Sequence, residues 1–96
     1  MGAPIPGQID AGIAGAVTIL QENGIETFES CEGGGGHAFP EPTVRFHGRH
    51  SGFKAFAVAM DYGLPVLALR LSYSEHDRAL DGPHWEIVFR EKVPAR

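Results

Sequence analysis

The 96-residue sequence has little cysteine, few basic residues and no long apolar run. Its single cysteine, Cys31, cannot form an internal disulfide, so nothing requires an oxidising compartment. Eight basic against twelve acidic residues give a formal charge of −4, which argues against a general nucleic-acid binder because phosphate backbones attract basic surfaces. No apolar run approaches the roughly 20 residues that span a bilayer, and no secretory signal opens the chain. These absences predict a cytoplasmic protein with no membrane or nucleic-acid-polymer partner.

The composition that remains, 43% apolar, is that of one small globular domain over residues 1–96. We expect a flexible Pro/Gly leader at 1–7 and a flexible tail at 92–96. Apolar residues at helical spacing predict a helix from Gln8 to Asn23, ended by Gly24. A second helix should follow a Ser51 cap and end at Gly63. Its predicted inner face is Phe53, Phe56, Ala57 and Met60.

Four segments alternate as strands do: 25–30, 43–47, 66–73 and 84–90. Leu67, Leu69 and Leu71 should point inward, and 74–83 should be a polar loop. The order α-β-β-α-β-β predicts an α+β fold, a four-stranded, mainly antiparallel sheet with two helices on one face. Its halves resemble each other, through internal duplication or through two common units in a row. The open face would carry Thr43, Arg45, His47, Arg70, Ser72, Glu86 and Arg90.

The stretch S-C-E-G-G-G-G-H, Ser30 to His37, is the most unusual in the chain. Consecutive glycines are costly to order, and their free N–H groups can form a nest for a phosphate or carboxylate. The stretch lacks the G-K-[S/T] of a P-loop. A flexible linker is the alternative, but Cys and His at the ends of the run favour ligand binding.

Cys31 invites two catalytic interpretations. It could be a nucleophile with His37 or His47 as base, although the flanking Glu29 and Glu32 disfavour a thiolate. Packing in a core or a pocket wall is the commoner role of a lone cysteine. Cys31, His37, His47 and His50 could also ligate a metal, but their spacing matches no zinc pattern. We therefore expect no catalytic residues, metal or cofactor.

A basic cluster lies in the middle of the acidic chain. Arg45, Arg49 and Lys54, with His47 and His50, surround the predicted start of the second helix, where free N–H groups favour an anion. A solvated basic turn is the alternative. The ligand-binding hypothesis puts this cluster opposite the glycine stretch across one pocket. Tyr62, Tyr73 or Trp85 could stack on a base, although the core is the commoner place for Trp85.

One resemblance adds to this interpretation. The run G-I-E-T-F-E-S-C-E-G-G-G-G-H-A-F-P-E-P-T-V-R-F-H-G (24–48), with the later G-L-P-V and W-E-I-V-F segments, resembles small phage and prophage proteins of about this length. Their shared motifs carry no established reaction. The resemblance implies a phage anti-defence protein that acts in the host cytoplasm by binding a nucleotide signal of host immunity.

The sequence therefore predicts a homodimer that sequesters a small, phosphate-containing, nucleotide-like ligand without turning it over. A Cys/His or metal-dependent hydrolase of such a ligand is one alternative, and a protein-interaction module that uses the open sheet face is another. The predicted ligand-binding residues are Ser30, Cys31, Glu32, Gly33, Gly34, His37, Arg45, His47, Arg49, Lys54 and Arg70.

Overall fold

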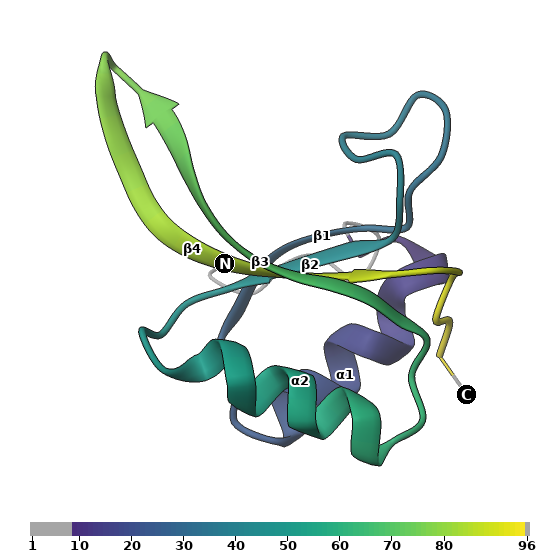
Figure 1. Ribbon diagram of the computed structural model, residues 1–96. Coiled ribbons are helices and arrows are strands. Elements are labelled where there is room, and N and C mark those ends of the chain that lie inside the picture. Colours follow the sequence, from purple (N-terminus) through teal and green to yellow (C-terminus); the bar gives the residue numbers. More distant parts are fainter. Residues whose placement is uncertain (1–8, 96) are drawn as a thin grey trace.

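A four-stranded sheet carries two helices on one of its faces in the computed structural model, which describes residues 9–95 (Figure 1). The elements, in chain order, are the 3-10 turn η2 (Ala11–Ile13), α1 (Ala14–Glu22), β1 (Thr27–Cys31), β2 (Thr43–Phe46), α2 (Ser51–Asp61), β3 (Val66–His76) and β4 (Ala79–Phe89). The predicted α+β class and the α-β-β-α-β-β order are confirmed. The predicted leader, 1–7, lies outside the described residues.

The strand order is β1-β2-β4-β3, and every neighbouring pair is antiparallel. Each helix-strand-strand half therefore places its second strand at the centre and its first strand at an edge. This arrangement is the one that two related units would adopt about a twofold axis between β2 and β4. Internal duplication itself stays a hypothesis.

The core lies between the sheet and the helices. Alternation along the central strands directs Val44 and Phe46 of β2, and Ile87 and Phe89 of β4, toward the helical layer, where all four are fully buried. The opposing side chains come mainly from η2 and α1, which bury Ile13, Ala16, Val17 and Leu20. This packing fixes which face of the sheet remains open.

The predicted inner face of α2 is wrong. The helix buries three small residues, Gly52, Ala55 and Ala59. All four residues that were predicted to point inward are exposed, namely Phe53 (75%), Phe56, Ala57 and Met60 (54%). The cause is close packing against the sheet: a Cβ at position 52 would collide with the ring of Trp85. Only small residues fit this contact. The N-cap is His50, not Ser51, and its side chain makes no capping hydrogen bond.

The polar loop expected at 74–83 is also absent: β3 and β4 continue through it and meet in a two-residue turn. Asp77 and Arg78 have φ of 50° and 66°, and positive φ at both central residues is typical of a type I′ hairpin. The hairpin rises on the face away from the helices (Figure 1). Of the leucines predicted to point inward, Leu69 packs on the core, but Leu67 and Leu71 are exposed because β3 is an edge strand.

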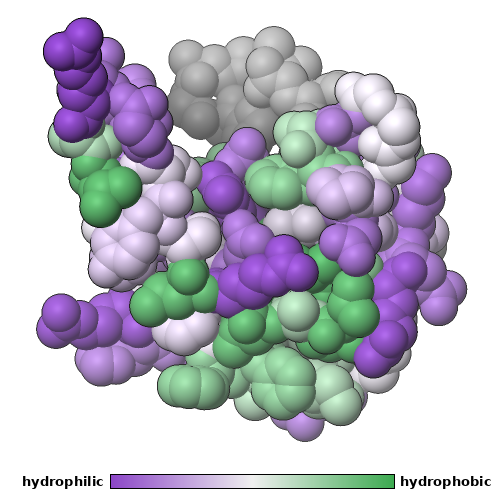
Figure 2. All heavy atoms as spheres, turned by 45° about the horizontal axis from the view of Figure 1, so that its top comes forward, coloured by the Kyte–Doolittle hydropathy of each residue, from purple (hydrophilic) through white to green (hydrophobic). Residues whose placement is uncertain are grey.

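These corrections reveal a continuous apolar surface. It combines exposed residues of the α2 outer face with exposed residues of β3, namely Phe53, Phe56, Met60, Leu67 and Leu71. Figure 2 shows apolar side chains gathered over β3 and α2, below the hydrophilic tip of the hairpin. We call these residues the apolar face.

The segment after β4 packs against the start of α1. Val93 is buried, its N–H donates to the Gly12 carbonyl at 2.8 Å, and its carbonyl accepts from the N–H of Gly15 at 2.9 Å. A Cβ on Gly15 would collide with this segment, so the glycines that weaken the helix permit the contact. Among residues 9–95, no helix combines the length and apolarity that crossing a membrane requires.

Candidate functional site

Three adjacent strands hold a charged group on the open face of the sheet. The register pairs Arg45 of β2 and Arg70 of β3 with the same residue of β4, Glu86. The Glu86 side chain is only 8% exposed, and it accepts hydrogen bonds from Arg45 Nε at 3.2 Å and from Arg70 Nη1 at 3.5 Å. Because a carboxylate at this depth needs partners, it draws both guanidinium groups to one place on the sheet. We call these three residues the arginine group.

The two arginines differ in their freedom. Arg45 is 19% exposed; it also donates to Glu29 at 3.3 Å and lies 5.2 Å from the centre of the Phe39 ring. Arg70 is 54% exposed, so most of its five guanidinium donors face solvent. Arg70 is therefore the better placed of the two to receive an anion.

An aromatic cluster continues the open face beside the arginine group. The rings of Phe28 and His47 are stacked with centroids 4.3 Å apart, and His84 lies 5.0 Å from Phe28 and 6.0 Å from His47. Phe28 remains 42% exposed. Such a cluster can stack on the planar ring of a ligand.

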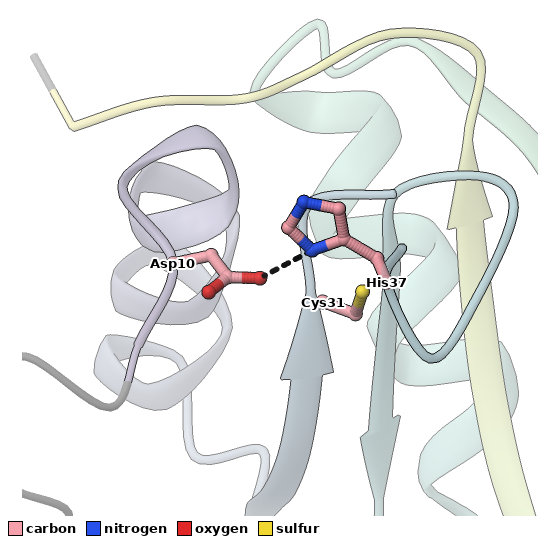
Figure 3. Close-up of side chains that lie close together, drawn as sticks. All are labelled: Asp10, Cys31 and His37. Carbon is pink, nitrogen blue, oxygen red and sulfur yellow. Dashed lines mark ion pairs between the residues drawn. The ribbon is translucent and has the colours of Figure 1, made fainter. Parts of the chain in front are cut away.

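A second cluster, which we call the loop corner, consists of Asp10, Cys31, Glu32 and His37. Asp10 precedes η2, Cys31 ends β1, and His37 is in the β1–β2 loop, yet the three side chains converge in Figure 3. His37 Nδ1 is 3.6 Å from Asp10 Oδ2, and His37 Nε2 is 3.6 Å from Glu32 Oε2. One ligand atom from each of Asp10, Cys31 and His37 lies within 4.8 Å of the others.

Backbone hydrogen bonds fasten the loop corner. The N–H of Glu32 donates to Asp10 Oδ2 at 3.0 Å, and the N–H of Gly12 donates to Glu32 Oε1 at 2.8 Å. The two carboxylates thus tie the start of the helical layer to the end of β1. Lys92 also reaches Glu32 Oε2, at 3.7 Å.

The glycine run folds back on itself to place His37. Gly33 has φ of 84° and is so close to the returning chain that a Cβ there would lie 2.5 Å from the Glu41 carbonyl carbon. The N–H of Gly34 donates to the Pro40 carbonyl at 3.0 Å. The two carboxylates, Asp10 and Glu32, outnumber the one lysine, Lys92, and so suit a cation better than the phosphate that the sequence predicted for this loop.

The predicted binding residues therefore do not share one pocket. The loop corner lies before β2, whereas Arg49 and Lys54 follow its other end and are exposed. Lys54 belongs to α2, on the opposite side of the sheet from Arg45. Ser30 pairs with Val44 and lines a 290 Å³ pocket between α1 and β1. The structure brings together only Arg45, His47 and Arg70 on the open face, and Cys31, Glu32, Gly33, Gly34 and His37 around the loop corner.

Sequence reasoning missed Asp10, Phe28 and His84. Asp10 is 21 residues from Cys31, so no local spacing joins the two. The alternation of β1 and β4 could have placed Phe28 and His84 near the open face, but a bulge between Thr27 and Glu29 changes the register of β1.

Comparison of the chain with family models, with curated proteins and with solved structures found no match.

Proposed function

We propose that the open face binds a small anionic, nucleotide-like ligand and does not turn it over. The arginine group carries the proposal: one nearly buried carboxylate, Glu86, holds two guanidinium groups side by side on an accessible face. Guanidinium groups bind phosphate through two parallel hydrogen bonds, and a guanidinium that is already held, as that of Arg45 is, loses less entropy on binding. Arg70 would meet the ligand first, and Arg45 would exchange its exposed partner Glu29 for a ligand oxygen.

The aromatic cluster supports a ligand that carries a base. His47 follows Phe46 at the end of β2, and the ring of Phe28 stacks on the ring of His47. Both rings therefore lie on the open face near Arg45. The glycine loop and the β3–β4 hairpin rise on this same side of the sheet (Figure 1). A ligand with a phosphate and a planar ring would therefore have both recognised on one surface.

Sequestration is the form of binding that we favour. A nucleophilic role for Cys31 requires substrate access, and its 4% exposure gives little. We propose that the ligand is a nucleotide signal of host immunity in the host cytoplasm, as the resemblance of residues 24–48 to small phage proteins implies. Capture alone would be enough to interrupt such a signal.

Calorimetry with AMP, ADP-ribose and a cyclic dinucleotide tests this proposal. We expect at least one of them to bind wild-type protein, to lose at least tenfold affinity with Arg70→Ala, and to be recovered chemically unchanged. Lys54→Ala removes the same charge on the other side of the sheet and is the matched control. Failure of all three compounds to bind, or equal losses with Arg70→Ala and Lys54→Ala, would contradict the proposal.

We also propose that the apolar face pairs with a second copy of the chain. Phe53 and Met60 of α2 lie beside the edge strand β3, whose outer hydrogen-bonding groups have no neighbouring strand among the described residues. Exposed apolar surface beside an open edge favours association. Antiparallel pairing of β3 with its own copy is twofold symmetric and brings both α2 helices to the same side.

Sedimentation equilibrium tests the homodimer. Met60→Glu should shift the protein toward monomer because it puts charge in the centre of the apolar face. Leu80→Glu, at a 74% exposed site on the hairpin, is the control and should leave the association unchanged. A monomeric wild type would show that the apolar face has another role.

A further inference from the structure

We propose that the loop corner is a binding site for a zinc-like divalent transition metal, ligated by Cys31 Sγ, His37 Nδ1 and an Asp10 carboxylate oxygen. Sulfur, imidazole nitrogen and carboxylate oxygen are the three donors that zinc takes in proteins. They come from three separate segments of the chain, and they converge on one point (Figure 3). This site is separate from the arginine group and does not depend on the function proposed for the open face.

The distances suit a single ion. Zinc lies about 2.0–2.1 Å from nitrogen and oxygen ligands and about 2.3 Å from sulfur, so tetrahedral ligand atoms are about 3.3–3.6 Å apart. His37 Nδ1 and Asp10 Oδ2 are 3.6 Å apart. The three donors lie within 4.8 Å of one another, so a pair at that limit must approach by about 1.2 Å to share a tetrahedral ion. The side chains of Asp10 and His37 are each 34% exposed, so solvent can reach the site from their side.

The groups around the donors have the contacts that metal ligands require. When Nδ1 binds the metal, Nε2 carries the proton, and Glu32 Oε2 faces Nε2 at 3.6 Å. A carboxylate on the distal nitrogen of a ligating histidine fixes its tautomer and orients the ring. The N–H of Gly33 donates to Cys31 Sγ at 3.4 Å, and such a donor stabilises the negative charge of a thiolate. The hydrogen bond to Cys31 is already formed, and Glu32 lies close to Nε2.

The glycine run lets Cys31 and His37 reach the same point. Cys31 and His37 are separated by five residues, and the chain must reverse within them to direct both side chains at Asp10. Positive φ at Gly33, Gly34 and Gly36 makes this reversal possible. The spacing matched no zinc pattern because the third ligand, Asp10, precedes η2.

Metal binding by purified wild-type and variant protein tests the site. We expect one Zn²⁺ per chain, a zinc-dependent rise in melting temperature, and thiolate-to-metal charge-transfer absorption when Co²⁺ replaces Zn²⁺. Cys31→Ser should remove this absorption, and His37→Ala should weaken zinc binding at least tenfold. His76→Ala, at an exposed hairpin site, is the matched control and should leave zinc affinity unchanged.

A conservative variant covers the case in which ligand substitutions prevent folding. Glu32→Gln retains an oxygen for the Gly12 N–H but removes the charge that faces His37, and it should lower zinc affinity about 10–100-fold. Absence of stoichiometric zinc binding by the wild type, Co²⁺ binding without thiolate absorption, or equal zinc affinity in Glu32→Gln and wild type would each overturn the proposal.

Discussion

The loop corner and the open face are both built from acidic and basic groups in contact, but the proportions of these groups differ. In the loop corner two carboxylates, Asp10 and Glu32, flank the one imidazole of His37. On the open face Glu86 joins two arginines, and Arg45 also pairs with the exposed Glu29. The first arrangement suits a cation and the second suits an anion. The two groups use different residues, although Glu29 and Cys31 lie on the same strand and Phe39 of the β1–β2 loop contacts Arg45.

The largest effect should come from Glu86→Ala. Removing one partner of a fully buried ion pair costs about 3–5 kcal/mol, and partial exposure of Arg45 and Arg70 should reduce the loss in unfolding free energy to about 3 kcal/mol. Nucleotide affinity should fall with it, because the two arginines then repel each other. Urea denaturation measures the stability, and unchanged zinc affinity shows that the loop corner is independent. If Glu86→Ala lost both zinc and nucleotide binding, the two sites would not be independent.

Gly33→Ala should affect only the loop corner. Strain at positive φ costs about 1–3 kcal/mol, and the new Cβ would press on the chain at Glu41, so we expect about 2 kcal/mol of lost stability and weaker zinc binding. Gly35→Ala is the matched control, because a Cβ there meets no atom within 4 Å. Denaturation and zinc titration of both variants check the prediction, and equal behaviour of the two would refute the role given to Gly33.

Phe28→Ala tests whether the open face recognises the base of a nucleotide. Stacking of an aromatic side chain on a base contributes about 1–3 kcal/mol, so AMP should lose about tenfold affinity while inorganic phosphate loses little. Calorimetry with both compounds makes the comparison. If AMP and phosphate lose affinity equally, Phe28 shapes the site without touching a base.

Lys54→Ala should have the smallest effect. Exposed residues outside special features change stability by no more than about 0.5 kcal/mol, and Lys54 lies away from both sites. Thermal denaturation with and without Zn²⁺ or AMP should match the wild type. If Lys54→Ala bound AMP more weakly than the wild type, Lys54 would belong to the ligand site, as the sequence predicted.

Much of the fold follows from local patterns. The Gly24 and Gly63 helix ends are confirmed by φ of 84° and 70°, and alternation in β2 and β4 correctly divides buried Val44 and Ile87 from charged Arg45 and Glu86. The buried face of a strand can be predicted from the sequence when only one of its faces is apolar, as in β2 and β4.

The inner face of α2 could not be predicted because the helix is apolar on two sides. Large residues such as Phe53 and Met60 favour burial by size, but the sheet approaches too closely at Gly52 for them to fit. That distance is a tertiary property set by Trp85. The same limit applies at 74–83, where polar residues suggested a loop although cross-strand pairing continues to the turn.

The loop corner shows a further limit of prediction from the sequence. Its residues Cys31 and His37 were evident from the glycine run, but local spacing cannot supply the partner that defines the chemistry. Asp10 reaches them only because α1 packs beneath the sheet. The arginine group depends likewise on the neighbouring positions of β2, β4 and β3. Candidate residues were therefore predictable, whereas their grouping required the fold.

Chemical-shift mapping of backbone amides with Zn²⁺ and then with AMP tests the separation of the two sites most directly. We predict two distinct sets of shifts: Zn²⁺ should move amides near Asp10 and in 31–37, and AMP should move amides near Phe28, His47, Arg70 and Glu86. Shifts of the same amides by both compounds would contradict the account, as would shifts by AMP confined to the glycine loop.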